Sequence, residues 1–224
     1  FVNVKSASRK NKLATDLLTS FGLSSTGYKL ESHFSKQRKW LDEIYRNTGK
    51  EQGCKDYQEQ CDFINFFGNY AQFYKEIWTD YKGENRMLAP RLAGIKDAEL
   101  ASLLLLYLKD SNHKMAITIL GRFYSDLIND KPNSATLFIE ACKLIAAFYT
   151  LWRSSDSNTG LDNVYRNFFR EDDNEYSGNS WIKTRNIDIT VLKKYLQKVL
   201  TDKSVGEKDR WLRKAKNYLS YKKS

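Results

Sequence analysis

Apolar residues recur along the chain with the period of an α-helix. In the middle of the chain, apolar residues recur every three or four positions and so share one helical face: Phe63, Phe67, Tyr70, Tyr74 and Ile77. A second stripe of this kind is formed by Leu137, Ala141, Leu144, Ile145, Phe148 and Trp152. Between the two stripes, residues 98–108 and 115–128 have the same pattern. The pattern therefore predicts a core of packed helices.

Further helices are predicted on both sides of this core. They cover residues 13–20, 30–46, 161–169, 189–200 and 208–221. Two polar stretches, 79–86 and 171–180, are expected to be loops, and the strand-like residues 1–4 are too short to form a sheet alone. The expected fold is therefore all-α, an irregular multi-helix bundle of about eight or nine helices with at most a trace of strand at the N-terminus.

Two breaks divide the central helices. Residues 109–112 separate the first pair, and Ser111 is a candidate N-cap for the helix that follows. Residues 130–134 end that helix and cap the next one, because Pro132 lacks the backbone donor that a continuing helix needs.

Composition narrows the class of protein. The chain has 224 residues, of which 41% are hydrophobic, 11 are glycine and only two are proline, which argues against a turn-rich sandwich or barrel. Its longest apolar run, residues 103–108, is too short to span a bilayer, so no membrane partner is expected. The three cysteines follow no disulfide pattern, which favours a cytoplasmic protein.

The chain begins with Phe1 and is interpreted as a piece of a longer protein. Residues 1–20 are expected to be the tail end of a preceding domain and a connecting helix, and residues 21–224 the helical bundle. The oligomeric state is left open.

Candidate catalytic groups are sparse. The two histidines, His33 and His113, are isolated, and both are expected at the surface or at the start of a helix. Cys54 and Cys61 are seven positions apart, which fits no zinc-site spacing, and Cys142 is expected in the core. Neither a glycine-rich phosphate loop nor a nucleophile elbow occurs. The sequence therefore predicts no catalytic, cofactor-binding or metal-binding residue.

Positive charge is concentrated at the two ends of the chain. The net charge is +10, and most of the excess lies in residues 1–50 and 201–224. Two basic clusters are candidates for contact with the phosphates of DNA: Lys36, Arg38, Lys39, Arg210, Arg213 and Lys214. The alternative interpretation is an ordinary solvated helix surface.

Several segments, read in order, resemble one protein family. Phe1-Val2-Asn3-Val4-Lys5-Ser6 and Leu13-Ala14-Thr15-Asp16-Leu17-Leu18 are similar to the end of its N-terminal domain. Trp40 with Ile44, then residues 63–67, look like the helices that follow, and residues 211–219 resemble the helix leading to its nuclease domain. The family is that of bacterial defence proteins related to the GmrSD-type modification-dependent restriction endonucleases, which join a ParB-like nucleotide-hydrolysing domain, a helical middle region and an HNH nuclease domain.

The resemblance implies that this chain is the helical middle region. Its partners would be DNA and the flanking domains of the parent protein, and an NTP and a divalent metal would belong to those domains. The D-G-Q-Q-R-type motif and the H-N-H triad do not occur in the sequence, so no active-site residue is carried over.

Three functions are compatible with these observations. The first is a non-catalytic scaffold that couples a nucleotide-dependent sensor domain to a DNA nuclease domain. The second is a stand-alone helical interaction module that uses an aromatic groove. The third is a helical nucleic-acid-binding protein whose phosphate contacts come from the two basic clusters. A complete enzyme is the least favoured, since no group of residues forms a recognisable site.

Overall fold

A computed structural model describes residues 6–49, 53–79, 91–154, 160–170, 180–182, 184 and 187–206. Every regular element in these ranges is a helix, so the predicted all-α multi-helix bundle is confirmed. The elements are α1 (Ala7–Thr26), α2 (Phe34–Arg46), α3 (Tyr57–Gln72), the π-helical η1 (Phe73–Thr79), α5 (Ala98–Asp110), α6 (Ala116–Ile128), α7 (Ser134–Ser154), α8 (Leu161–Arg170) and α9 (Ile189–Gly206).

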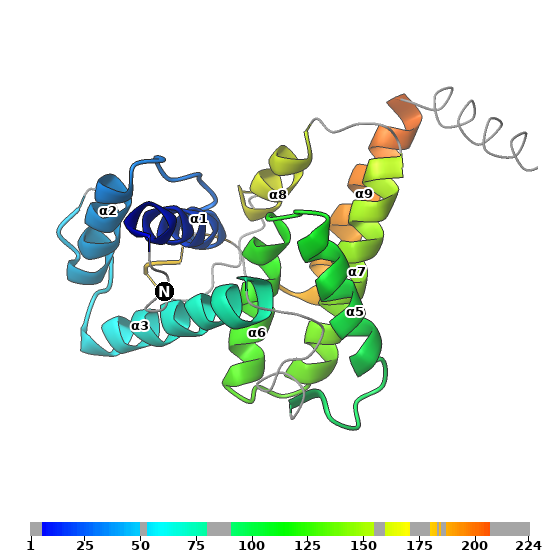
Figure 1. Cartoon of the computed structure of the whole chain (residues 1–224), viewed down its shortest axis with the longest axis horizontal. Coiled ribbons are helices and arrows are strands. Elements are labelled where there is room, and N and C mark those ends of the chain that lie inside the picture. Colours follow the sequence, from blue (N-terminus) through cyan, green and yellow to red (C-terminus); the bar gives the residue numbers. More distant parts are fainter. Residues whose placement is uncertain are drawn as a thin grey trace, which may run out of the picture.

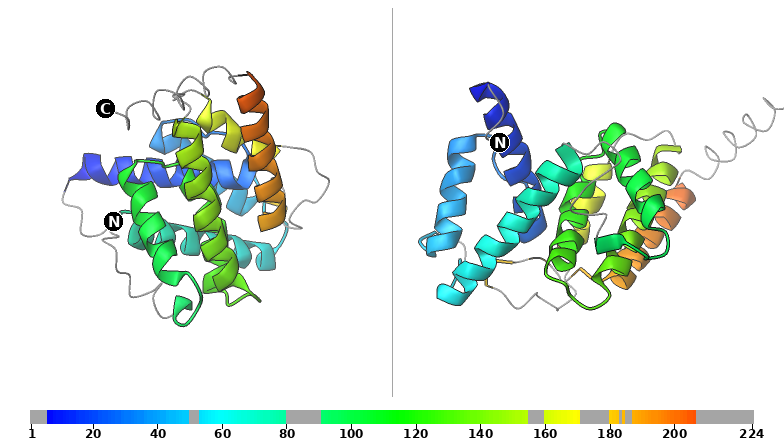
Figure 2. Two further views of the ribbon diagram at one scale, coloured as in Figure 1. Left: turned by 90° about the vertical axis from the view of Figure 1, so that its right-hand side faces the viewer. Right: turned by 60° about the horizontal axis from the view of Figure 1, so that its bottom comes forward.

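The helices form two groups that meet at α6. In one group α1 packs against α2 and α3, and in the other α7 packs against α5, α6 and α9 (Figure 1). Helix α6 contacts α1 and α3 as well as α7, and α8 joins α1 to α9. The views in Figure 2 show α1 and α2 lying side by side, with α3 running from them toward the second group.

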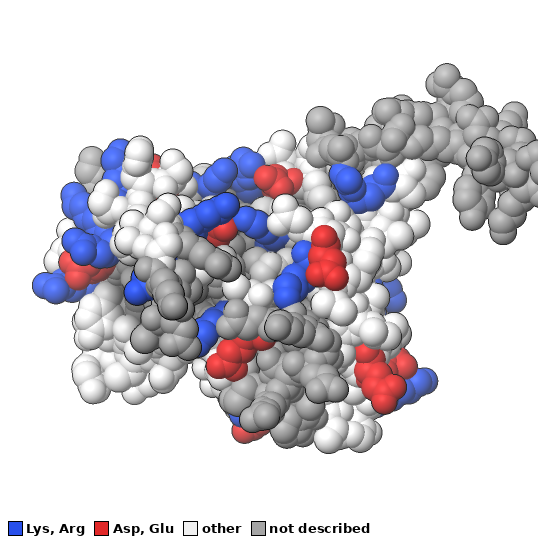
Figure 3. All heavy atoms as spheres, in the orientation of Figure 1, with Lys and Arg blue, Asp and Glu red and all other residues white. Residues whose placement is uncertain are grey.

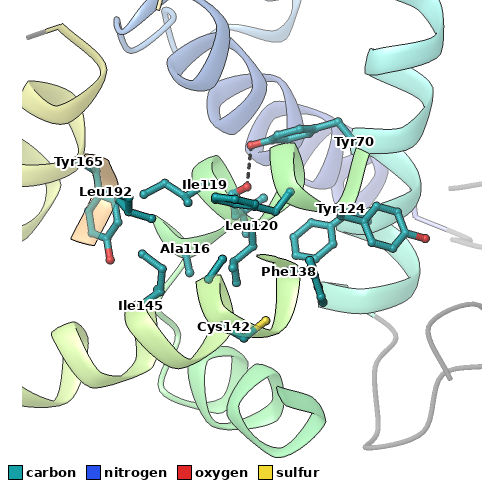
Figure 4. Close-up of a cluster of buried hydrophobic side chains, with 14 of the residues drawn as sticks. Tyr70, Ala116, Ile119, Leu120, Tyr124, Phe138, Cys142, Ile145, Tyr165 and Leu192 are labelled. Carbon is teal, nitrogen blue, oxygen red and sulfur yellow. Dashed lines mark hydrogen bonds between the residues drawn. The ribbon is translucent and has the colours of Figure 1, made fainter. Parts of the chain in front are cut away.

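The core is centred on α6, which is buried on nearly all sides. Residues 116–125 of this helix are all buried, and side chains from α3, α7, α8 and α9 surround it (Figure 4). Tyr70 of α3 points toward α6, where its hydroxyl donates to the carbonyl of Ile117 at 3.0 Å. A Cβ atom on Gly121 would lie 2.4 Å from the Tyr70 ring, so the close approach of α3 and α6 depends on this glycine.

Helix α7 is the most apolar long helix of the bundle. Among the described residues, it is the one helix that is long and apolar enough to cross a membrane by length and composition alone. Half of its most apolar stretch is buried, and the helix packs against α5, α6 and α9. Its place inside the bundle therefore accounts for the apolar pattern.

Most helix bounds agree with the sequence pattern, and two expectations change. Helix α1 (Ala7–Thr26) is much longer than the predicted 13–20, and the division into domains at residue 20 stays a prediction. Ser111 is not an N-cap: it is the residue after α5, and α6 begins only at Ala116. The polar stretch 129–133 separates α6 from α7 as predicted.

Some expectations fall on other parts of the chain. The strand-like residues 1–4, the helix predicted at 208–221, residues 80–86 of the first loop and residues 171–179 of the second lie outside the described residues.

Candidate functional site

A basic cleft opens where α1, α7 and α8 approach the turn between α5 and α6. It has a volume of about 440 Å³, which is within the range of small-molecule pockets. Four cationic side chains line it, each from a different segment of the chain: Lys29, Lys114, Arg153 and Arg166. Two carboxylates, Asp16 and Asp162, complete its charged lining.

Positive charge is in excess in this basic cleft. Lys114 Nζ lies 2.9 Å from Asp16 Oδ2, and this ion pair joins the α5–α6 turn to α1. Within the described parts of the chain, no carboxylate lies within ion-pair distance of the other three cations. Basic side chains also gather on the molecular surface above α1 and toward α8 (Figure 3). Such a concave surface attracts anions.

An aromatic pair forms the floor of the basic cleft. The ring of His113 is only 4% exposed and stacks on Tyr149, with 4.2 Å between ring centroids. His113 Nε2 lies 2.7 Å from the hydroxyl of Tyr165, and the Tyr149 hydroxyl donates to the carbonyl of Ser111 at 3.2 Å. Both buried polar side chains thus have hydrogen-bond partners, as buried polar groups require.

These buried groups do not provide acid–base chemistry near neutral pH. Burial, assisted by the positive charge of Arg153, lowers the pKa of His113 to about 3. Burial raises the pKa of Tyr165 far above its ordinary value of 10. Both shifts keep the two side chains neutral at neutral pH, where they contribute packing and hydrogen bonds.

The predicted surface position is confirmed for one of the two histidines and is wrong for the other. His33 is exposed and precedes the first residue of α2, as the sequence predicts. The same prediction is wrong for His113, because α7 and α8 cover the α5–α6 turn and supply it with an aromatic ring and a hydroxyl partner.

A second cleft, of about 550 Å³, is lined by residues of α3 and α6 and by Trp181, Ile182 and Ile187. Arg122 lines it although this side chain is only 8% exposed. Its Nη1 donates to the carbonyl of Ser24 at 3.3 Å and to Thr184 Oγ1 at 2.8 Å, and Thr184 Oγ1 donates to the same carbonyl at 2.8 Å. Burial lowers the pKa of Arg122 to about 10, so the guanidinium stays charged at neutral pH. This network ties α6 to the end of α1.

Three of the predicted DNA contacts line neither cleft. Lys36, Arg38 and Lys39 are all exposed on α2. Lys36 pairs with Glu31, and Lys39 Nζ lies 3.5 Å from Glu43 Oε1. The other three candidates lie outside the described residues: Arg210, Arg213 and Lys214. The assignment of all six to DNA binding stays a prediction.

The sequence pattern did not reveal the basic cleft. Its four cations are spread from Lys29 to Arg166, and no motif connects them. Only the tertiary packing of α1 against α8 brings them together. The one sequence feature that indicates a basic surface of this kind is the overall excess of positive charge.

The cysteines agree with their sequence interpretation. Cys142 is buried in the core, Cys54 is buried, and Cys61 is half-buried. Burial raises the pKa of the Cys54 thiol to about 11, which keeps it protonated at neutral pH. Across the described ranges, no group of three or more histidine, cysteine, aspartate or glutamate side chains is arranged to hold a metal ion.

No family model matches the chain, and no curated protein matches it.

Proposed function

We propose that this chain is the non-catalytic helical scaffold of a bacterial restriction or phage-defence protein. In this role it couples a nucleotide-dependent sensor domain to a DNA nuclease domain. The resemblance of its segments to the GmrSD-type family supports the proposal. The structural observation that supports it is the position of α1. Helix α1 contacts α2, α3, α6 and α8, so it reaches into both helix groups.

Aromatic packing holds α1 in the first helix group. Phe21 is fully buried, and the centroid of its ring lies 4.9–6.3 Å from those of five other aromatic rings. These rings belong to Trp40, Phe63, Phe66, Phe67 and Tyr70. Close-packed interiors move as rigid units. A displacement of α1 would therefore carry α2 and α3 with it.

Polar contacts hold α1 to the second group. The Ser24 carbonyl accepts a hydrogen bond from Arg122 of α6. Asp16 forms an ion pair with Lys114, which lies in the turn between α5 and α6. The Gly27 carbonyl, directly after α1, accepts from Arg170 Nε of α8 at 2.8 Å. These contacts cross from one helix group to the other, so they are placed where a movement of one group would reach the other.

The test uses the full-length parent protein, with NTP hydrolysis and DNA cleavage measured separately. The variant Asp16→Asn combined with Arg122→Met removes one contact of α1 with the α5–α6 turn and one with α6. We expect NTP hydrolysis to persist while NTP-dependent cleavage falls at least tenfold, because the sensor remains intact but its movement no longer reaches the nuclease. Leu103→Ala, at an exposed position on α5, is the control and should leave both activities unchanged.

Two outcomes would contradict the proposal. One is a parent protein with neither a nucleotide-hydrolysing nor a nuclease activity. The other is a double variant that folds, as judged by its melting temperature, and still cleaves DNA in response to NTP like the unmodified protein.

A second candidate function is DNA binding by the exposed face of α2. The observation that favours it is the exposure of Lys36, Arg38 and Lys39 along one short stretch of this helix. Arg38 has no carboxylate within ion-pair distance among the described residues, so its charge is available to a phosphate.

A further inference from the structure

We propose that the basic cleft is a binding site for a phosphorylated small molecule of mononucleotide size. The proposal does not depend on the scaffold function. It rests on the volume of the cleft, on the convergence of cations from four segments, and on the aromatic floor described above.

The arrangement of charge fits a compact anion. Four cations and two carboxylates line the cleft, which leaves two positive charges in excess, and the one cation of the four with an ion-pair partner among the described residues is Lys114, which pairs with Asp16. The other three cations come from the α1–α2 connection, the end of α7 and α8, and they line one cavity. A duplex is instead contacted by cations that follow its backbone over a long surface. A ligand with one to three phosphates matches the cleft better.

The two arginines supply the most specific recognition. A guanidinium presents its N–H groups in a planar fork that matches two phosphate oxygens at once. Arg153 lies at the end of α7 and Arg166 in the second turn of α8. Since both helices are anchored in the core, by Trp152 and Tyr165 respectively, the backbone that carries each arginine is held in place.

The rest of the lining can receive the non-phosphate part of the ligand. Met115, Ile117 and Leu23 provide apolar surface, and Tyr149 and His113 provide aromatic surface next to it. Thr19 and Ser20 of α1 contribute hydroxyl groups at the edge of the cleft. An apolar wall with a few polar groups is typical of ligand pockets.

Isothermal titration calorimetry tests the site. ATP, AMP, tripolyphosphate and adenosine are titrated into the protein at one fixed ionic strength. We expect ATP to bind with one-to-one stoichiometry and more tightly than AMP or tripolyphosphate, while adenosine shows no binding. Arg153→Gln combined with Arg166→Gln should weaken ATP binding at least tenfold.

The matched control removes the same charge elsewhere. Arg38→Gln combined with Arg46→Gln replaces two exposed arginines of α2 and should change the ATP affinity less than twofold. Thermal melting establishes that both double variants fold.

Three results would overturn the proposal. The first is the lack of ATP and AMP binding at millimolar concentration. The second is an equal loss of affinity in both double variants, which would indicate a non-specific charge effect. The third is binding of a DNA oligonucleotide that requires Arg153 and Arg166 while the mononucleotides do not bind.

Discussion

At the scale of single residues, Gly121 decides how closely α3 can approach α6. Its missing side chain leaves room for the buried ring of Tyr70, and an added Cβ would lie 2.4–3.0 Å from three ring atoms. We expect Gly121→Ala to lower the free energy of unfolding by about 1–3 kcal/mol, because an overpacked core must shift backbone or rotamers. Urea denaturation followed by circular dichroism measures this value.

Gly68 provides the matched control for that substitution. It lies in α3, two positions before Tyr70, and a Cβ there would meet no heavy atom within 4 Å among the described residues. Gly68→Ala should raise the free energy of unfolding by roughly 0.5–1 kcal/mol, since alanine is the better helix former. If Gly121→Ala were as stable as Gly68→Ala, the close packing of Tyr70 on α6 would be wrong.

His113 should make the stability depend on pH. Its pKa is about 3 in the folded protein against 6.5 in an unfolded chain, so the unfolded state takes up the proton first as the pH falls. The contribution is complete above pH 6.5 and is lost progressively as the pH falls toward 3. We expect an added slope of about 1 kcal/mol per pH unit between roughly pH 6 and pH 4.5.

The measurement compares unfolding curves of the unmodified protein with those of His113→Gln across this pH range. The variant should lack the added slope even though it is less stable, since glutamine does not titrate. The control is His33→Gln at the exposed position before α2, which should keep the slope of the unmodified protein. Equal slopes in all three proteins would contradict the buried, neutral state of His113.

At the scale of helices, α5 has a buried face and an exposed face, and leucines only two positions apart lie on the two faces. Leu105 is 1% exposed in the core, whereas Leu103 is 64% exposed. Leu105→Ala should lower the free energy of unfolding by about 2–5 kcal/mol, because it leaves a cavity against neighbouring helices. Leu103→Ala should change it by less than about 0.5 kcal/mol. Similar losses at both positions, measured by denaturant titration, would mean that α5 is rotated about its axis.

Periodicity predicted the central helices well because their apolar faces are long. The stripes from Phe63 to Ile77 and from Leu137 to Trp152 lie in α3, η1 and α7, and they face the core. The extent of α1 was missed because its second half reads as a turn: Gly22, Ser24, Ser25 and Thr26. These residues are buried, and the Ser25 and Thr26 hydroxyls donate to the carbonyls of Phe21 and Gly22 within the helix. Local propensity could not show that tertiary burial would stabilise this helix.

The hydrogen-bond partners of the polar groups at the two clefts could not be predicted from the spacing of residues in the sequence. His113 bonds to Tyr165, which lies 52 positions away, and Arg122 bonds to Thr184, which lies 62 positions away. A buried polar side chain is tolerated only where such partners meet it, and the sequence does not show which helices pack together. The prediction that no catalytic site exists also rested on local motifs, which describe only sites built from neighbouring residues.

At the scale of the whole molecule, the net charge of +10 favours association with polyanions, yet much of the charge on α2 is locally balanced. Lys36, Lys39 and Arg46 each have an acidic partner, whereas Arg38 has none among the described residues. A cation that is already paired releases less of the counterion atmosphere of DNA when it meets a phosphate. The residues of α2 should therefore contribute unequally to any contact with DNA.

Salt dependence of duplex binding tests this unequal contribution. In a plot of the logarithm of affinity against the logarithm of salt concentration, Arg38→Gln should reduce the magnitude of the slope by about 0.9, the value for one phosphate contact. Arg46→Gln changes the same residue type on the same helix, but this arginine lies 2.8 Å from Asp42, so the slope should stay nearly unchanged. Fluorescence anisotropy with a labelled duplex gives both values. If both variants kept the slope of the unmodified protein, α2 would not belong to the DNA-binding surface, and its excess charge would be a property of a solvated helix face.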